Sequence, residues 1–347
     1  MKMNQLGRTG IEVSAFCLGS MTWGTQTTEA EGHAQIDRAL DAGINFIDTA
    51  EMYPVNPISA ETSGRTEAII GTWLARTGRR DEVVLATKIS GAGNRAVRDG
   101  APISGAGIRA AVEGSLRRLQ TDYIDLYQLH WPNRGSYMFR QNWDYDPSQQ
   151  DRADTLTHMQ EVLEALQAEV QRGTIRAVGL SNESAWGSSE WLRLAELGQG
   201  PRMATIQNEY SLMCRLFDTD LAELSVNEDL GLLAFSPLAA GLLSGKYQDG
   251  AIPAGSRMSI VDNLGGRKGP RAFEAVAAYL DVAARHGLDP VQMALAWCLI
   301  RPFMASVIFG ATTQAQLEHA LGAADLVLSE EVLRDLNAVH RAHPMPY

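Results

Sequence analysis

The stretch FIDTAEMY, residues 46–53, joins an apolar run to a carboxylate. Phe46 and Ile47 are typical of a buried strand, and Asp48 stands where that run ends. An unpaired buried charge is costly, so Asp48 needs a partner from a neighbouring segment. Tyr53 follows after a short interval and places a phenol near the same carboxylate.

Similar short, almost continuously apolar runs recur along the chain, as expected of strands that are covered on both faces. We expect strands at 15–21, 45–50, 82–89, 123–131, 175–182, 203–210, 231–238 and 306–311. Helical periodicity predicts helices at 29–43, 65–77, 108–120, 156–173, 188–197, 271–286, 290–300, 314–324 and 329–340. This alternation, without a break in composition, predicts an α/β fold: a closed (β/α)8 TIM barrel in one domain, 1–347.

Three segments depart from the alternation. The opening MNQLGRTGIEVS, residues 3–14, predicts a β-hairpin that plugs one end of the barrel. Long loops are expected after strand four, at 132–153, and after strand seven, at 239–270. Loops of this length inside a domain are usually functional or disordered. For residues 132–153, a surface loop without a ligand role is an equally open alternative.

Composition excludes several classes of function. The net charge of −11 argues against a nucleic-acid binder, which needs a basic face. The three cysteines form no CxxC pair and the histidines form no HExxH motif, so we expect no metal site. The N-terminus has no signal-peptide core, and no apolar run approaches the length of a membrane span, so we expect a cytoplasmic location. No feature predicts an oligomeric state.

Polar groups stand at the ends of successive strands. In a parallel barrel these ends share one face, where active sites are built. Each group alone has an ordinary structural explanation, and a single histidine is most often a core residue. Together they favour a site, made of Asp48, Lys88, His130, Ser181, Asn182, Gln207, Ser236, Pro237, Gly310 and Thr312.

Asp48, Lys88 and His130 come from three neighbouring strands, and Tyr53 comes from the loop after the first of them. Asp48 would keep Lys88 charged, and the cation would lower the pKa of Tyr53 from its usual value of about 10. A phenol tuned in this way can donate a proton to a carbonyl oxygen, which His130 would orient. No nucleophile is evident, so the set favours carbonyl reduction by hydride from a cofactor.

The other strand ends suit a dinucleotide. Ser181, Asn182 and Gln207 offer donors and acceptors to a nicotinamide carboxamide, and Tyr210 offers a ring for stacking. Ser236 and the amides of SPLAAGLLSG, with Lys246 and Arg257 nearby, suit a pyrophosphate, and GATT precedes a helix as an anion site. Two Rossmann-like patterns, GAGNRA (91–96) and GAGIRA (105–110), lack the direct succession of strand, turn and helix that this motif requires.

The whole chain resembles the aldo-keto reductase family, in particular its Tas-like bacterial branch, which is related to potassium-channel β-subunits. The resemblance rests on LGRTGIEVSAFCLGSMTWG, GINFIDTAEMYP, SLRRLQTDYIDLYQLHWP, IRAVGLSNES, IQNEYSLMCR, LLAFSPLAAGLLSGKY and GLDPVQMALAW. It implies a barrel with NADPH at its C-terminal face. It also implies a catalytic tetrad of Asp48, Tyr53, Lys88 and His130.

The resemblance also implies the cofactor contacts. Nicotinamide would meet Ser181, Asn182, Gln207 and Tyr210; the phosphates would meet Ser236, Leu238, Gly241, Lys246 and Arg257; the adenine ribose would meet Gly310, Thr312 and Gln316; and Ser20, Met21, Gln26 and Pro237 complete the set. Trp23, Met52 and Trp131 suggest a mainly apolar substrate pocket. The chain departs from the family pattern where His319 and Ala320 replace Glu and Asn, and where Glu209 replaces Pro.

We therefore expect reversible, NADPH-dependent reduction of small aldehydes and ketones. Lys246, Arg257 and Thr312 favour NADP over NAD, because their cationic or donor groups suit a 2′-phosphate. One alternative is a regulatory or scaffold subunit that uses bound NADPH as a redox sensor. A further alternative is a metal-dependent barrel hydrolase that uses His130 and Asp48.

Overall fold

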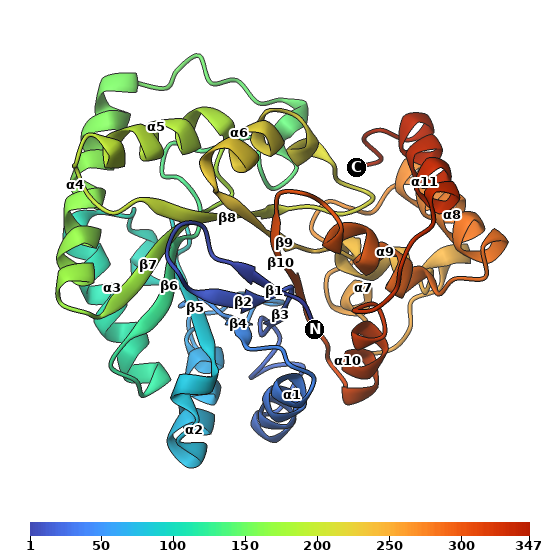
Figure 1. Ribbon diagram of the computed structural model, residues 1–347, viewed down its shortest axis with the longest axis horizontal. Helices are drawn as coiled ribbons and strands as arrows, with labels where there is room; N and C mark the ends of the chain where they lie inside the picture. Colours follow the sequence, from blue (N-terminus) through green and yellow to red (C-terminus); the bar gives the residue numbers. More distant parts are fainter.

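The computed structural model describes residues 1–347, and its main sheet is a closed parallel barrel with the strand order β10-β3-β4-β5-β6-β7-β8-β9 (Figure 1). The barrel strands are β3 (Phe16–Gly19), β4 (Phe46–Asp48), β5 (Val84–Ile89), β6 (Ile124–Leu129), β7 (Ile175–Ser181), β8 (Met203–Glu209), β9 (Gly231–Phe235) and β10 (Met304–Phe309). The predicted (β/α)8 TIM barrel is confirmed. Strand β9 ends earlier than expected, because Ser236 takes a left-handed conformation, with φ of 59°.

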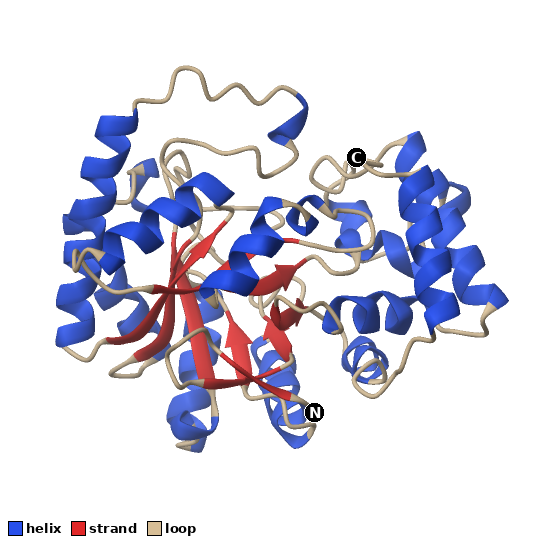
Figure 2. Ribbon diagram, turned by 45° about the horizontal axis from the view of Figure 1, so that its top comes forward, coloured by secondary structure: helices blue, strands red, loops and turns tan.

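Helices surround the strands, as Figure 2 shows in blue around red. They are α1 (Glu29–Asp41), α2 (Arg65–Thr77), α3 (Gly105–Leu119), α4 (Arg152–Gln171), α5 (Ala185–Glu196), α6 (Asp220–Glu228), α7 (Arg257–Ile260), α8 (Pro270–Arg285), α9 (Pro290–Leu299), α10 (Gln314–Leu321) and α11 (Glu330–Ala342). Short 3-10 helices occur at Arg80–Glu82, Arg98–Gly100, Gln141–Trp143, Leu216–Asp218, Ala239–Ser244 and Gln248–Gly250. The sequence did not predict α6 or α7. Helix α6 buries only Leu221 and Ser225, so its apolar periodicity is weak.

The N-terminal hairpin consists of β1 (Met3–Gln5) and β2 (Glu12–Ser14), which pair antiparallel. Leu6, Ile11 and Val13 belong to the same buried cluster as the inward-facing Phe46 and Ala86 of the barrel. The hairpin therefore plugs the end of the barrel opposite the C-terminal strand ends, as predicted. None of the helices is both long enough and apolar enough to cross a membrane.

The inside of the barrel changes character along its axis. At its lower end the inward side chains are apolar and join the cluster under the hairpin. At the C-terminal strand ends, buried polar side chains replace them: Asp48, Lys88, Gln128 and Gln207. A larger cluster of 72 buried hydrophobic residues fills the space between barrel and helices. The polar layer is thus enclosed by apolar packing on its sides and below.

Two long connections rise from the polar end of the barrel, as predicted. The first follows β6 and reaches α4, and it includes the short helix Gln141–Trp143; in Figure 1 it is the green segment beside α4. The second follows β9 and reaches α8, and it includes α7 and two short 3-10 helices. In keeping with the expectations from the sequence, we call residues 132–153 the substrate-side loop and residues 239–270 the cofactor-side loop.

Candidate active site

Lys88 is the centre of the polar layer. Strand pairing places Asp48 on β4 beside Ala86 and Lys88 on β5 beside Gln128, so all these side chains share one rim. The ammonium of Lys88 donates to Asp48 Oδ2 at 2.6 Å, to the Thr49 carbonyl at 2.8 Å and to the Tyr53 hydroxyl at 3.3 Å. Asp48 and Lys88 are both buried. The structure brings together the carboxylate, cation and phenol that the sequence predicted.

The surroundings of Lys88 keep it charged. Burial lowers the pKa of its ammonium, but Asp48 and the Tyr53 oxygen raise it, and the net shift is upward. A buried ion pair is held by its geometry and by hydrogen bonds to its remaining donors. The ammonium uses three donors on three oxygens, so it is a fixed positive charge beneath Tyr53.

The predicted pKa of Tyr53 was wrong in direction. Burial raises the pKa of the phenol, while Lys88 lowers it, and the net shift is upward from 10.0. The sequence showed the nearby cation but not how thoroughly the phenol is enclosed. Tyr53 therefore holds its proton at neutral pH, with Lys88 limiting the rise.

His130 follows β6 and lies beside the phenol. Its ring centroid is 5.9 Å from that of Tyr53 and 4.9 Å from that of Trp131. Burial first, and Lys88 second, hold the pKa of His130 well below 6.5, so the imidazole is neutral. Its buried Nδ1 has no hydrogen-bond partner in the protein. A neutral imidazole at this place can donate to a carbonyl oxygen or orient it.

Gln128 was missed by the sequence analysis. Its amide donates to Asp48 Oδ1 at 3.2 Å, and the amide of Gln207 donates to the same oxygen at 2.8 Å and to Gln128 Oε1 at 3.1 Å. Asp48 is thus held by two amides on one oxygen and by Lys88 on the other. The sequence could have indicated Gln128 because it lies two residues before His130. That spacing places both side chains on the inner face of one strand.

Glu51 supports the segment that carries Tyr53, and it too was missed. Its carboxylate accepts from the Ser90 amide at 2.7 Å and from Arg98 at 3.1 Å. Burial raises the pKa of Glu51, against the effect of Arg98. These contacts tie the loop after β4 to the loop after β5, so they fix the backbone next to the phenol.

The predicted nicotinamide residues fall into two groups. Asn182 donates to the His130 carbonyl at 3.0 Å and to Ser181 Oγ at 3.1 Å, while its own side-chain oxygen is buried without a partner. A buried acceptor of this kind suits a carboxamide NH₂, so these residues fit a nicotinamide. Gln207 lies at the same rim, but its amide nitrogen is engaged by Asp48 and Gln128.

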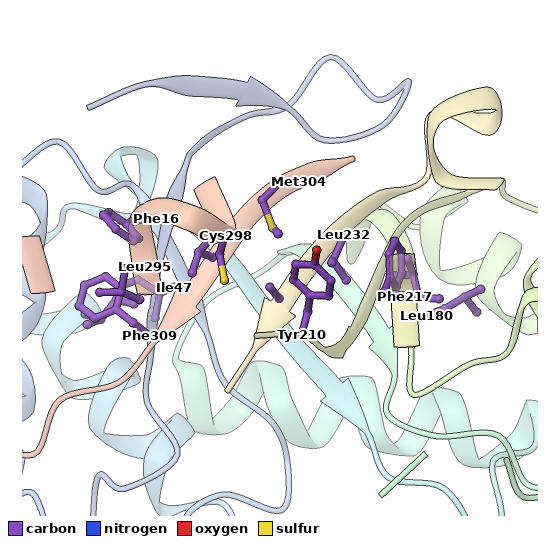
Figure 3. Close-up of a cluster of buried hydrophobic side chains, with 14 of the residues drawn as sticks. Phe16, Ile47, Leu180, Tyr210, Phe217, Leu232, Leu295, Cys298, Met304 and Phe309 are labelled. Atoms are coloured by element: carbon purple, nitrogen blue, oxygen red, sulfur yellow. The ribbon is translucent and has the colours of Figure 1, made fainter. Parts of the chain in front are cut away.

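Tyr210 does not face this rim. Its ring stacks on Trp297 at 5.3 Å and its hydroxyl donates to Asp218 at 2.5 Å, within the buried cluster of Figure 3. Because side chains alternate along a strand, a residue three positions after Gln207 faces the opposite side. The predicted stacking of Tyr210 on nicotinamide is therefore wrong.

The three residues predicted for the substrate pocket differ in how accessible they are to a ligand. Trp23 is completely buried, and its indole donates to Gln35 of α1 at 3.3 Å, so it has no surface to offer a ligand. Trp131 is half-buried and meets Phe139 edge-on, with centroids 6.2 Å apart. Met52 is buried, with its sulfur 3.6 Å from the Asn94 amide nitrogen. Trp131 also lines a cavity of ≈ 300 Å³ with Ser181, and no residue of the predicted tetrad lines it.

The residues predicted for the phosphates lie along the cofactor-side loop. Arg257 makes its hydrogen bond to the Met21 sulfur at 3.3 Å, and Gln26 donates to the Gly255 carbonyl at 3.4 Å. This loop therefore reaches across the barrel mouth to the segment after β3. Lys246 lies against Gly241, where a Cβ atom would come within 3.1 Å of its Nζ.

Other predicted contacts are held by local bonds. Ser20 donates to the Asp48 carbonyl at 2.7 Å, and Ser236 Oγ accepts from the Ala240 amide at 3.0 Å. Pro237 and Leu238 follow Ser236 at the end of β9, where Pro237 is buried and Leu238 is half-buried.

At the far end of the mouth, Thr312 donates twice to Gln316 Oε1, at 2.9 and 3.0 Å, next to the exposed Gly310. His319 pairs with Asp289 at 2.9 Å, and Ala320 is buried. The replaced positions thus present neither a free carboxylate nor a free amide. No group of His, Cys, Asp and Glu side chains is arranged to hold a metal ion.

The family model that matches this chain is described as the aldo/keto reductase family, and it covers residues 15–341. The chain belongs to the aldo/keto reductase family. Among curated relatives of this reductase, Protein tas of Escherichia coli (strain K12) is 45% identical over 353 residues, which covers 100% of this chain and 99% of that protein.

More distant relatives of this aldo/keto reductase include both an oxidoreductase and a channel subunit. An uncharacterized oxidoreductase, YrpG of Bacillus subtilis (strain 168), is 35% identical and covers 98% of this chain and 96% of its own length. A probable voltage-gated potassium channel subunit beta of Arabidopsis thaliana is 31% identical, over 99% of this chain and 98% of its own length. Members of the family are oxidoreductases that act on small carbonyl compounds and generally use nicotinamide cofactors.

Proposed function

We propose that this aldo/keto reductase reduces small aldehydes and ketones to alcohols, reversibly, with NADPH. The observation that carries the proposal is the buried ammonium of Lys88, which binds Asp48 and Tyr53 at once on the rim next to His130. The arrangement supplies an acid and a fixed charge but no nucleophile. It therefore suits a reaction in which the attacking group comes from a cofactor.

Each residue has a defined part in this proposal. A bound nicotinamide cofactor supplies the hydride. Tyr53 gives its proton to the carbonyl oxygen and takes it back in the reverse direction. Lys88 stabilises the phenolate that forms, and Asp48 keeps Lys88 in place. His130, neutral and partly unpaired, orients the carbonyl oxygen.

The preference for NADP over NAD rests on three side chains. Arg257 has the Met21 sulfur as its hydrogen-bond partner, and Lys246 lies exposed on the same loop, so both cations are available to a 2′-phosphate. Thr312 adds a hydroxyl at the far end of the mouth. His319 and Ala320 offer few contacts to the adenine. The contacts to the 2′-phosphate are therefore expected to supply most of the preference for NADP over NAD.

A second candidate is a regulatory subunit that binds NADPH without turnover, and the channel-subunit relatives favour it. The intact set of Asp48, Tyr53, Lys88 and His130 favours the enzyme.

The test is NADPH oxidation, followed by absorbance, with a panel of small aldehydes and ketones, together with the dissociation constants of NADPH and NADH. Turnover with several carbonyls and tighter binding of NADPH are expected. Tight NADPH binding without turnover would favour the regulatory subunit, and equal affinities would refute the NADP preference.

A further inference from the structure

A buried ionic cluster lies at the barrel mouth, around Glu209 at the end of β8. Glu209 Oε2 accepts from Arg140 at 2.7 Å, and Oε1 accepts from Arg267 at 2.7 Å and from the Tyr347 hydroxyl at 3.2 Å. The side chains of Arg140, Glu209 and Arg267 are 17%, 7% and 8% exposed. This cluster joins the substrate-side loop, the cofactor-side loop and the C-terminus at one carboxylate.

Glu209 supplies the negative charge that faces the two arginines of this cluster. Two guanidinium groups share one carboxylate, and burial and Arg267 together lower the pKa of Arg140. A buried charge that loses its partner is strongly destabilised. Without the carboxylate, the two arginines would face each other with no anion between them and would move apart. Glu209 thus binds one arginine from each of the two loops.

The loops also touch directly. Gly266 of the cofactor-side loop has φ of 88°, and a Cβ atom there would lie 3.2 Å from Arg140 Nε. A Cβ on Gly265 would lie 3.4 Å from Arg267 Nη1 and 3.7 Å from Arg140 Nη2. The backbone of one loop is therefore the surface on which the arginine of the other rests.

The cluster reaches the catalytic rim through Phe139. Phe139 and Arg140 both have left-handed backbones, with φ of 57° and 66°, which non-glycine residues adopt only when their surroundings hold them. The Phe139 ring meets Trp131 at 6.2 Å, and Trp131 meets His130 at 4.9 Å. Arg140 is therefore the chain neighbour of an aromatic ring that contacts Trp131, next to His130.

We propose that Glu209 is a positioning residue that couples the two loops, so that the substrate wall at Phe139 forms only when the cofactor-side loop is closed. The inference rests on the proposed function, because it assigns the loops to a carbonyl substrate and NADPH. Glu209 acts through Arg140 and Arg267 and takes no part in proton transfer. It makes selectivity for the larger carbonyl compounds depend on how tightly NADPH is held.

The test uses three variants of the full chain. Arg140→Met cuts only the substrate-side link and leaves the Arg267–Glu209 pair intact. KM for benzaldehyde should rise about tenfold, and much less for acetaldehyde, because misplacing a positioning group penalises the substrate that it packs against. Arg140→Met should also speed NADPH release, but less than Arg267→Met does, because a coupling between two loops acts in both directions. Glu209→Gln should show both effects, and Arg140→Lys, which keeps the charge, should recover part of the KM.

Matched glycine variants control for backbone strain. Gly266 and Gly250 have similar φ values, 88° and 75°, but only a Cβ on Gly266 would meet Arg140, and nothing lies within 4 Å of one on Gly250. Gly266→Ala should therefore raise the KM for benzaldehyde, whereas Gly250→Ala should not. Thermal unfolding of each variant establishes that it is folded.

Chymotrypsin cleavage in the substrate-side loop gives a readout that needs no turnover. NADPH should protect this loop in the wild type and fail to protect it in Arg140→Met and Glu209→Gln. If wild-type protein reduces no carbonyl, the proposed function fails, and this protection alone decides the coupling. If the folded variants keep the wild-type KM for benzaldehyde, NADPH release rate and protection, the coupling is wrong even though the enzyme is active.

Discussion

At the scale of single residues, the site is centred on a charged lysine, Lys88, whose ammonium is held by three hydrogen bonds. Lys88 gives its donors to Asp48, Thr49 and Tyr53, while Asp48 takes two amides on its other oxygen. The polar layer therefore has almost no rotational freedom. Tyr53 keeps its proton because burial, which raises its pKa, outweighs the effect of the cation. His130 stays neutral because burial and Lys88 both lower its pKa.

These pKa directions predict the pH dependence. Reduction needs the protonated phenol, so its rate should persist through neutral pH and fall only as pH rises through the raised pKa of Tyr53, above 10.0. Alcohol oxidation needs the phenolate and should increase over that range. His130 is neutral throughout, so no acidic limb is expected near its usual pKa of 6.5. Measuring the rate of the chemical step against pH in both directions checks this prediction. A reduction rate that falls between about pH 6 and about pH 8 would contradict it.

Gln128 offers a second prediction. Gln128→Leu keeps the volume but removes one donor from Asp48 Oδ1, so the carboxylate can turn away from Lys88. We expect kcat to fall about tenfold, equivalent to roughly 1.4 kcal/mol of transition-state stabilisation. NADPH affinity should be unchanged, because the side chain of Gln128 is completely buried and is bound to Asp48 and Gln207. Steady-state kinetics and NADPH titration measure both; an unchanged kcat would mean that Gln207 alone orients Asp48.

At the scale of elements, the sequence predicted the strands and nearly all the helices because apolar runs mark them plainly. It also brought Asp48, Lys88 and His130 to one face, since parallel strands end together. It placed Tyr210 wrongly because strand alternation turns that ring outward onto Trp297. Trp23 was misplaced because only the fold brings α1 against it. Gln128 was overlooked because a single polar residue inside a strand carries no pattern of its own.

The hairpin allows stability to be separated from chemistry. Leu6 is completely buried under the barrel, at the end opposite the polar layer. Leu6→Ala should lower the free energy of unfolding by about 2–5 kcal/mol through the cavity that it leaves. Its kcat should equal that of the wild type below the unfolding transition. Denaturant unfolding and kinetics measure the two quantities. Met3→Ala, at an exposed position, is the control, and a large loss of kcat in Leu6→Ala would show that the plug reaches the site.

At the scale of the whole molecule, an acidic chain has a cationic mouth. The net charge is −11, yet Arg140, Lys246, Arg257 and Arg267 gather on the two long loops above the polar layer. The sequence indicated Lys246 and Arg257 but neither Arg140 nor Arg267. It could not show that Glu209 joins two of them, because that contact depends on how both loops and the C-terminus fold over the barrel. We therefore propose that the mouth combines a dinucleotide path with a wall that Glu209 holds in place.

The central claim is that Tyr53 supplies the proton, and Tyr53→Phe tests it most directly. The variant removes one oxygen and leaves Lys88 bound to Asp48 and Thr49. With NADPH and a good aldehyde, single-turnover measurement should show a rate lower by roughly 10²–10⁴-fold, the usual contribution of a general acid. NADPH should bind as tightly as to the wild type. Undiminished turnover in a folded variant that binds NADPH would contradict the account.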